Sequence, residues 1–81
     1  MSYEFSIFGE RHEAATFAEC SAIFSRIRDE SLEGASEFPA VVRIREVGYA
    51  MPVARFSYNG RIWRDKPWAE GDVPLYDNRA A

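Results

Sequence analysis

The stretch Val53-Ala54-Arg55-Phe56-Ser57-Tyr58-Asn59-Gly60-Arg61-Ile62-Trp63-Arg64 decides the fold of this chain. Asn-Gly between two short apolar-rich runs is the strongest short-range signal of a β-hairpin, because a two-residue type I′ turn needs positive φ at both central positions. Such a turn also fixes the register, and it sets Phe56 opposite Trp63 and Arg55 opposite Arg64. The sequence therefore predicts two antiparallel strands, residues 53–58 and 61–64.

Two further segments have the alternation of apolar and polar residues that is typical of strands. Residues 3–8 predict a half-buried strand with Tyr3, Phe5 and Ile7 facing inward, and the β-branched run 41–47 predicts a second strand. The polar residues 10–13 between the first strand and the next element read as a loop. The first strand can lie at a sheet edge or beside the second strand, and we expect the second arrangement.

A helix is predicted from about Phe17. Thr16 and Glu19 have the spacing of a capping box, in which the two side chains satisfy free backbone N–H groups at the helix start. The apolar residues that follow lie on one stripe roughly 120° wide, which suits a helix packed on a sheet; they are Phe17, Cys20, Ile23, Phe24 and Ile27. The helix should end between Arg28 and Glu33.

The order of elements is thus β-α-β-β-β, a small α+β domain with one helix on an antiparallel-rich sheet. We expect this domain to span residues 1–66. Pro67, Gly71 and Pro74 make residues 67–81 an irregular C-terminal tail, packed on the same domain. Trp68 and Tyr76 in this tail either fold back against the sheet or anchor a partner.

Composition limits the class of protein. The chain has 81 residues, 47% of them hydrophobic, and Cys20 is its only cysteine, so no intrachain disulfide can form. The N-terminus has no basic region followed by an apolar run, and no apolar run approaches the roughly 18 residues of a membrane span. We expect a soluble protein of the cytoplasm with no membrane contact.

Charge is unevenly distributed along the chain. The net charge is −3 overall, but residues 1–40 carry −5, residues 41–66 carry +4 and residues 67–81 carry −2. The predicted register places four arginines on the sheet face that the helix leaves open. The partner-binding residues predicted from this pattern are Arg43, Arg45, Arg55 and Arg64, with Trp68 as an anchor.

Three interpretations of this arginine face stay open. It can bind an acidic protein surface or phosphate groups, because the planar guanidinium pairs with both. It can also be an ordinary solvated face whose arginines meet Glu46, Asp65 or the acids of the tail. A nucleic-acid surface would need aromatic residues on the open face, whereas the predicted register sends them to the core, and the isoelectric point is near 5.1.

Catalytic and metal-binding motifs are absent from the sequence. The acids around the helix end lack calcium-loop spacing, and they are Asp29, Glu30, Glu33 and Glu37. His12 reads as a surface residue and Cys20 as a buried one. We therefore predict no enzyme, no metal and no cofactor; a small enzyme that uses Glu30, Glu33 or His12 is the remaining alternative.

In size, acidity and one-helix-on-sheet character the chain resembles the small proteins of phages and mobile elements, some of which inhibit host defence complexes. The resemblance involves no motif and transfers no residue. Together with the residues above, it implies a non-catalytic binding or inhibitory module that acts through protein–protein contact, with a nucleic-acid binder as the alternative. A homodimer is compatible with either function, because an exposed edge strand can pair with its copy.

Overall fold

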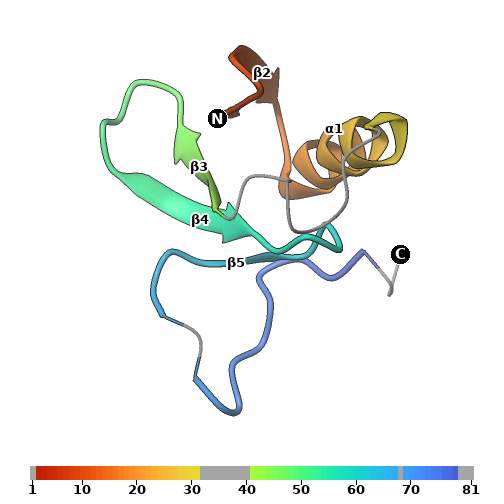
Figure 1. Cartoon of the computed structure of the whole chain (residues 1–81). Helices are drawn as coiled ribbons and strands as arrows, with labels where there is room; N and C mark the ends of the chain where they lie inside the picture. Colours follow the sequence, from red (N-terminus) through yellow and green to blue (C-terminus); the bar gives the residue numbers. More distant parts are fainter. Residues whose placement is uncertain (1, 32–40, 68, 79–81) are drawn as a thin grey trace.

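Within the described residues, five antiparallel strands form one sheet in the order β2-β1-β3-β4-β5, and one helix lies against a face of this sheet (Figure 1). The computed structural model describes residues 2–31, 41–67 and 69–78. The elements are β1 (Tyr3–Ile7), β2 (Glu10–Ala14), α1 (Phe17–Glu30), β3 (Val42–Glu46), β4 (Pro52–Phe56) and β5 (Ile62–Arg64). The predicted α+β class with one helix on an antiparallel sheet is confirmed.

Strand β2 occupies the residues that were predicted to be a loop, and that prediction was wrong. Phe8 and Gly9 connect β1 to β2 with φ of 52° and 79°, so this two-residue link is a type I′ turn. The strand was missed because its exposed face is fully charged, as is common for edge strands. Its inward face is carried by Ala14, which is buried, and by the half-buried His12.

Strand β1 lies beside β3, with Tyr3 opposite Glu46 and Glu4 opposite Arg45. Because β3 is the strand predicted for residues 41–47, this is the expected arrangement. Strand β3 continues the sheet to β4, where Val42 lies opposite Phe56 and a register shift follows Ile44.

Helix α1 begins and ends within the predicted limits. Thr16 is the N-cap and its Oγ1 accepts from the N–H of Glu19 at 3.1 Å, while the Glu19 carboxylate reaches back to the N–H of Ala15 at 3.5 Å. The helix ends at Glu30 with Ser31 as C-cap. The following connector, residues 32–40, lies outside the described residues.

The core lies between the helix and one sheet face. Phe24 of α1 stacks on Phe56 of β4 with ring centroids 4.2 Å apart, and Phe5 meets the same ring edge-on at 4.9 Å. Tyr3 stacks on Phe17 at 4.5 Å. The inward positions predicted for β1 and for the helix stripe therefore hold.

The register predicted for the β4–β5 hairpin was wrong by one residue. Phe56 lies opposite Ile62 and Arg55 opposite Trp63. Among these turn residues only Gly60 has positive φ, at +91°, so the connection is a three-residue loop with a type I turn and a glycine bulge, not a type I′ turn. A one-residue slip exchanges the two faces of a strand. Ile62 is therefore fully buried and Trp63 lies on the open face.

Tertiary hydrogen bonds hold this loop. Ser21 Oγ donates to the carbonyl of Gly60 at 2.8 Å, Arg28 Nη1 to that of Tyr58 at 3.1 Å, and Asn78 Nδ2 to that of Asn59 at 2.8 Å. Tyr58, predicted on the core face, is instead exposed at the tip of this loop.

The C-terminal segment returns to the outer edge of β5. The N–H of Leu75 donates to the carbonyl of Ile62 at 2.7 Å, and the N–H of Ile62 donates to the carbonyl of Tyr76 at 3.0 Å. Tyr76 also packs against the core cluster. Of the two alternatives given for Tyr76, folding back against the sheet is therefore the one observed. Trp68 lies outside the described residues.

Candidate binding pocket on the open sheet face

The open face of the sheet holds three of the four predicted arginines. Arg43 and Arg55 lie directly opposite each other on β3 and β4, and Arg45 follows on β3. Arg64 does not share their face: it lies opposite Ala54, whose side chain is in the core. The one-residue slip of the hairpin places Trp63 where Arg64 was expected.

Arg45 is engaged by a buried acid from β1. The Glu4 side chain, 9% exposed, forms ion pairs with both Arg45 and Arg11, and Arg11 Nη2 also lies 3.0 Å from Glu13. The hydrogen bond from Arg11 lowers the pKa of the Glu4 carboxyl; partial burial opposes this, and Arg45 adds to the lowering. Sequence analysis did not pair Glu4 with these arginines, because the pair with Arg11 depends on the unpredicted strand β2.

Arg43 and Arg55 are covered in part by the segment that follows β5. Arg43 Nε lies 3.1 Å from Asp65 Oδ1, and Arg55 Nε donates to the carbonyl of Lys66 at 3.3 Å. The pairing of Arg43 with Asp65 fits the interpretation of a solvated face. The arginines therefore do not form one continuous basic surface.

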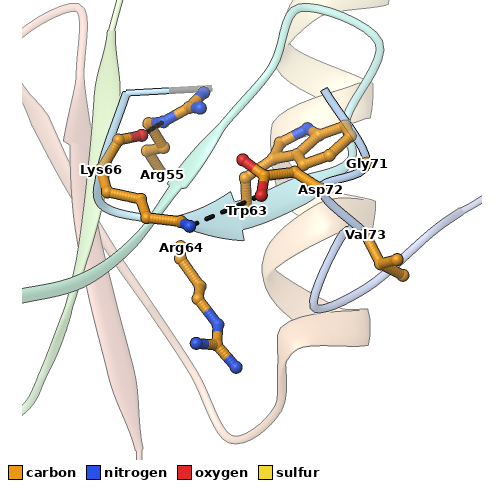
Figure 2. Close-up of a pocket in the computed structure, with 7 residues that line it drawn as sticks. All are labelled: Arg55, Trp63, Arg64, Lys66, Gly71, Asp72 and Val73. Atoms are coloured by element: carbon orange, nitrogen blue, oxygen red, sulfur yellow. Dashed lines mark hydrogen bonds and ion pairs between the residues drawn. The ribbon is translucent and has the colours of Figure 1, made fainter. Parts of the chain in front are cut away.

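A pocket of about 200 Å³ remains between β5 and the returning segment (Figure 2). Its walls are Arg55, Trp63, Arg64, Lys66, Gly71, Asp72 and Val73. These side chains carry three positive charges and one negative charge, so the pocket is cationic. A neighbouring hollow of about 380 Å³ shares Arg55 and Lys66 with it and extends to Arg43.

One wall of the pocket is ordered by local contacts. Lys66 Nζ lies 3.5 Å from Asp72 Oδ1, as Figure 2 shows, and Asp72 Oδ2 accepts from the N–H of Ala69 at 2.9 Å. That N–H lowers the pKa of Asp72, burial opposes this, and Lys66 adds to the lowering. Gly71 completes the turn with φ of +91°. Because Lys66 and Asp72 pair with each other, Arg55 is left as the cationic side chain that faces a ligand. The side chain of Arg64 lies at the rim of the pocket and points away from the indole of Trp63 (Figure 2).

Trp63 gives the pocket a flat apolar wall. Its Nε1–H donates to Ser57 Oγ at 3.1 Å, which fixes the orientation of the indole. The carbonyl of Arg64 accepts from the N–H of Lys66 at 2.9 Å, whereas its guanidinium forms no ion pair or hydrogen bond with the described residues. A fixed aromatic wall beside the guanidinium of Arg55 and the ammonium of Lys66 suits a compact anion with an apolar body, such as a carboxylate-bearing side chain.

Sequence reasoning missed Trp63 because it assigned this residue to the core. Ile62 is the signal that could have corrected this assignment. A β-branched apolar residue suits the core position opposite Phe56 better than a tryptophan that is followed by an arginine.

The remaining candidate residues do not form a site. Cys20 is fully buried, and burial, followed by the charge of Glu19, raises the pKa of its thiol to about 11. The ring of His12 packs 5.4 Å from that of Phe5. Glu30 is exposed at the helix end, and Glu33 and Glu37 lie outside the described residues. No group of three metal-ligating side chains occurs within residues 2–31, 41–67 and 69–78.

Among the described residues, no helix is long and apolar enough to cross a membrane. Comparison with known proteins gives no match to any family model, curated protein or solved structure. Inference about function therefore depends on the geometry of the pocket and the surface around it.

Proposed function

We propose that this protein is a non-catalytic binding module that holds an acidic segment of a protein partner in the pocket formed by Arg55, Trp63 and Lys66. The observation that carries the proposal is the pairing of a cationic pocket with an ordered indole wall. A volume of about 200 Å³ suits one or two side chains of a peptide. Occupation of the partner's surface, with no chemical step, would be its mode of action.

The distribution of ion pairs favours a protein partner over nucleic acid. A phosphate backbone is bound by a series of free cationic side chains, each of which releases counterions. Here Arg11 and Arg45 bind Glu4, Arg43 binds Asp65, and Arg61 binds Asp77 at 3.2 Å. With most of the described arginines already paired, one compact cationic pocket suits a localised carboxylate.

Exposed apolar residues of the β3–β4 loop extend the surface available to a partner. Strand β4 starts beside the end of β5, since Ala54 lies opposite Arg64. The β3–β4 loop that precedes it presents Tyr49 and Met51, which are 64% and 75% exposed. An acidic segment anchored in the pocket would pack its apolar residues there.

Selection from a displayed library of random peptides tests the proposal. We expect the selected peptides to be rich in Asp and Glu, and to lose at least tenfold in affinity for Arg55→Glu, because one charge-assisted hydrogen bond contributes about 1.5–3 kcal/mol. Arg26→Glu, on the exposed side of α1, makes the same charge change away from the pocket and should bind like the wild type.

A single-stranded oligonucleotide, titrated at low and near-physiological salt, is the competing probe. Peptides that bind Arg55→Glu as tightly as the wild type would contradict the proposal. Oligonucleotide binding that weakens log-linearly with salt and is lost in Arg55→Glu would replace it with the nucleic-acid alternative. The resemblance to phage and mobile-element proteins stays a prediction.

A further inference from the structure

Strand β2 is the unpaired edge of the described sheet. The opposite edge, at β5, is occupied by Leu75 and Tyr76, which form hydrogen bonds with Ile62. Beyond β2 the sheet order contains no further strand among the described residues. The strand has no proline or bulge to prevent pairing, and the charges on its exposed face, Arg11 and Glu13, are of opposite sign.

The turn at Phe8 and Gly9 determines which backbone groups face outward. In a two-residue hairpin the flanking pair, here Ile7 and Glu10, exchanges both hydrogen bonds, and hydrogen-bonded pairs then alternate along the ladder. The backbones of Glu10, His12 and Ala14 therefore face β1. Those of Arg11 and Glu13 point away from the sheet and offer two N–H and two C=O groups.

Charge selects among the ways in which two copies of this edge can pair. Two-fold symmetric pairing can place Arg11 opposite Arg11, Glu13 opposite Glu13, or Arg11 opposite Glu13 of the second copy. Like charges that face each other across strands destabilise a pair, and opposite charges stabilise it. Only the third register satisfies the outward backbone groups and brings opposite charges together.

We propose that two copies of this chain associate through β2 in that register, with Arg11 of each opposite Glu13 of the other. Four backbone hydrogen bonds join the strands, and the two-fold axis passes between the two His12 residues. The side chains involved are accessible, since those of Arg11 and Glu13 are 56% and 48% exposed. Within one protomer Arg11 Nη2 lies 3.0 Å from Glu13 Oε2. The four charges of the two paired β2 strands therefore alternate in sign across the interface.

The dimer would have one continuous sheet of ten strands. At a spacing of roughly 4.8 Å between strands, the two β5 edges lie roughly 40 Å apart. The pockets beside β5 would then stand at opposite ends of the sheet, clear of the seam, and a partner with two acidic segments would be held by both. This association does not depend on what the pockets bind.

Sedimentation equilibrium over a concentration series tests the association, with Glu13→Lys as the variant and Glu10→Lys as its matched control. Both substitutions make the same charge change on the same strand. Glu13→Lys places a lysine opposite Arg11 in both symmetric pairs, and we expect the association constant to fall at least about tenfold. Glu10→Lys faces Ala14 of the second copy and should leave the constant within about twofold.

Amide hydrogen exchange on the wild type tests the register without any substitution. In the monomer the amide of His12 is protected by β1, while those of Arg11 and Glu13 exchange fast. We expect both to become protected as concentration rises. A wild type that stays monomeric at millimolar concentration would overturn the proposal. So would a dimer in which these two amides stay fast, or equal weakening by the two lysine variants.

Discussion

The two hairpins of the sheet have opposite relations between local sequence and structure. Phe8-Gly9, which has no typical turn signature at its first position, forms a true type I′ turn, with φ of 52° and 79°. Asn59-Gly60 has the strongest signature for that turn and forms a longer loop instead. What differs is the surroundings: three side chains from the helix and the C-terminal segment donate to the carbonyls of the second loop.

Turn type in this sheet is therefore decided by what the loop contacts. In the three-residue loop, Asn59 Oδ1 accepts from the N–H of Arg61 at 3.2 Å and from Ser57 Oγ, and Ile62 enters the core. A type I′ turn would instead bury the larger Trp63 and place Ile62 on the open face. Because the open face gains Trp63, the choice of turn also creates the pocket.

Alanine at the two turn glycines should show the largest contrast. At Gly60 a new Cβ would lie 2.7 Å from Ser25 Oγ and 2.8 Å from Asn78 Nδ2, in backbone with positive φ. We expect Gly60→Ala to lower the free energy of unfolding by about 2–4 kcal/mol, from backbone strain and crowding together. Gly9→Ala meets no atom within 4 Å and should cost about 1–2 kcal/mol.

Urea denaturation of both variants measures this contrast. Equal losses at the two positions would mean that tertiary contacts do not hold the β4–β5 loop.

The β1–β2 hairpin is joined across its strands by the ion pair of Glu4 with Arg11, so acid should weaken it. The pKa of Glu4 is lower in the folded chain than in the unfolded chain. The stability that its ionised form contributes is therefore complete above about pH 4.3 and is lost as the pH falls through the lower folded value.

Glu4→Gln should flatten the dependence of unfolding free energy on pH in the acidic range. Thermal unfolding of both proteins between pH 2 and pH 7 checks this expectation. If the unfolding free energy of Glu4→Gln fell with acid as steeply as that of the wild type, the pH dependence would belong to other carboxylates.

Asparagine at position 8 should have the smallest effect, and it is stabilising. Phe8 is the only non-glycine residue with positive φ in the described chain, and an aromatic residue in this region is strained. Asn adopts it readily, so we expect Phe8→Asn to raise the free energy of unfolding by about 0.5–1 kcal/mol. A loss of stability in urea denaturation would instead show that the half-exposed Phe8 ring contributes more through its contacts than the strain costs.

The sequence predicted the elements whose signal is carried by their own side chains. The Thr16 cap and the stripe from Phe17 to Ile27 located the helix, and the alternation in residues 3–8 and 41–47 located β1 and β3. Strand β2 was missed because it starts with four charged or ionisable residues in a row. Ala14 is its one buried apolar residue, and a single such residue gives no alternating pattern.

The pocket could be predicted only in part. Arg55 and Arg64 were among the candidate residues and both line it, but through a register other than the one expected. Trp63, Lys66 and Asp72 come together because the chain after β5 folds over the open face and returns along the edge. That path depends on long-range hydrogen bonds between Leu75, Tyr76 and Ile62, which no local pattern records.

Two-dimensional NMR of the Trp63 indole and the Arg55 guanidinium signals tests whether the pocket binds a carboxylate. The titrants are a selected acidic peptide and the same peptide with Gln and Asn in place of Glu and Asp. We expect saturable shifts of both signals with the acidic peptide and none with the neutral one. Shifts that are equal for the two peptides, or that leave these two signals unmoved while others change, would contradict the proposal.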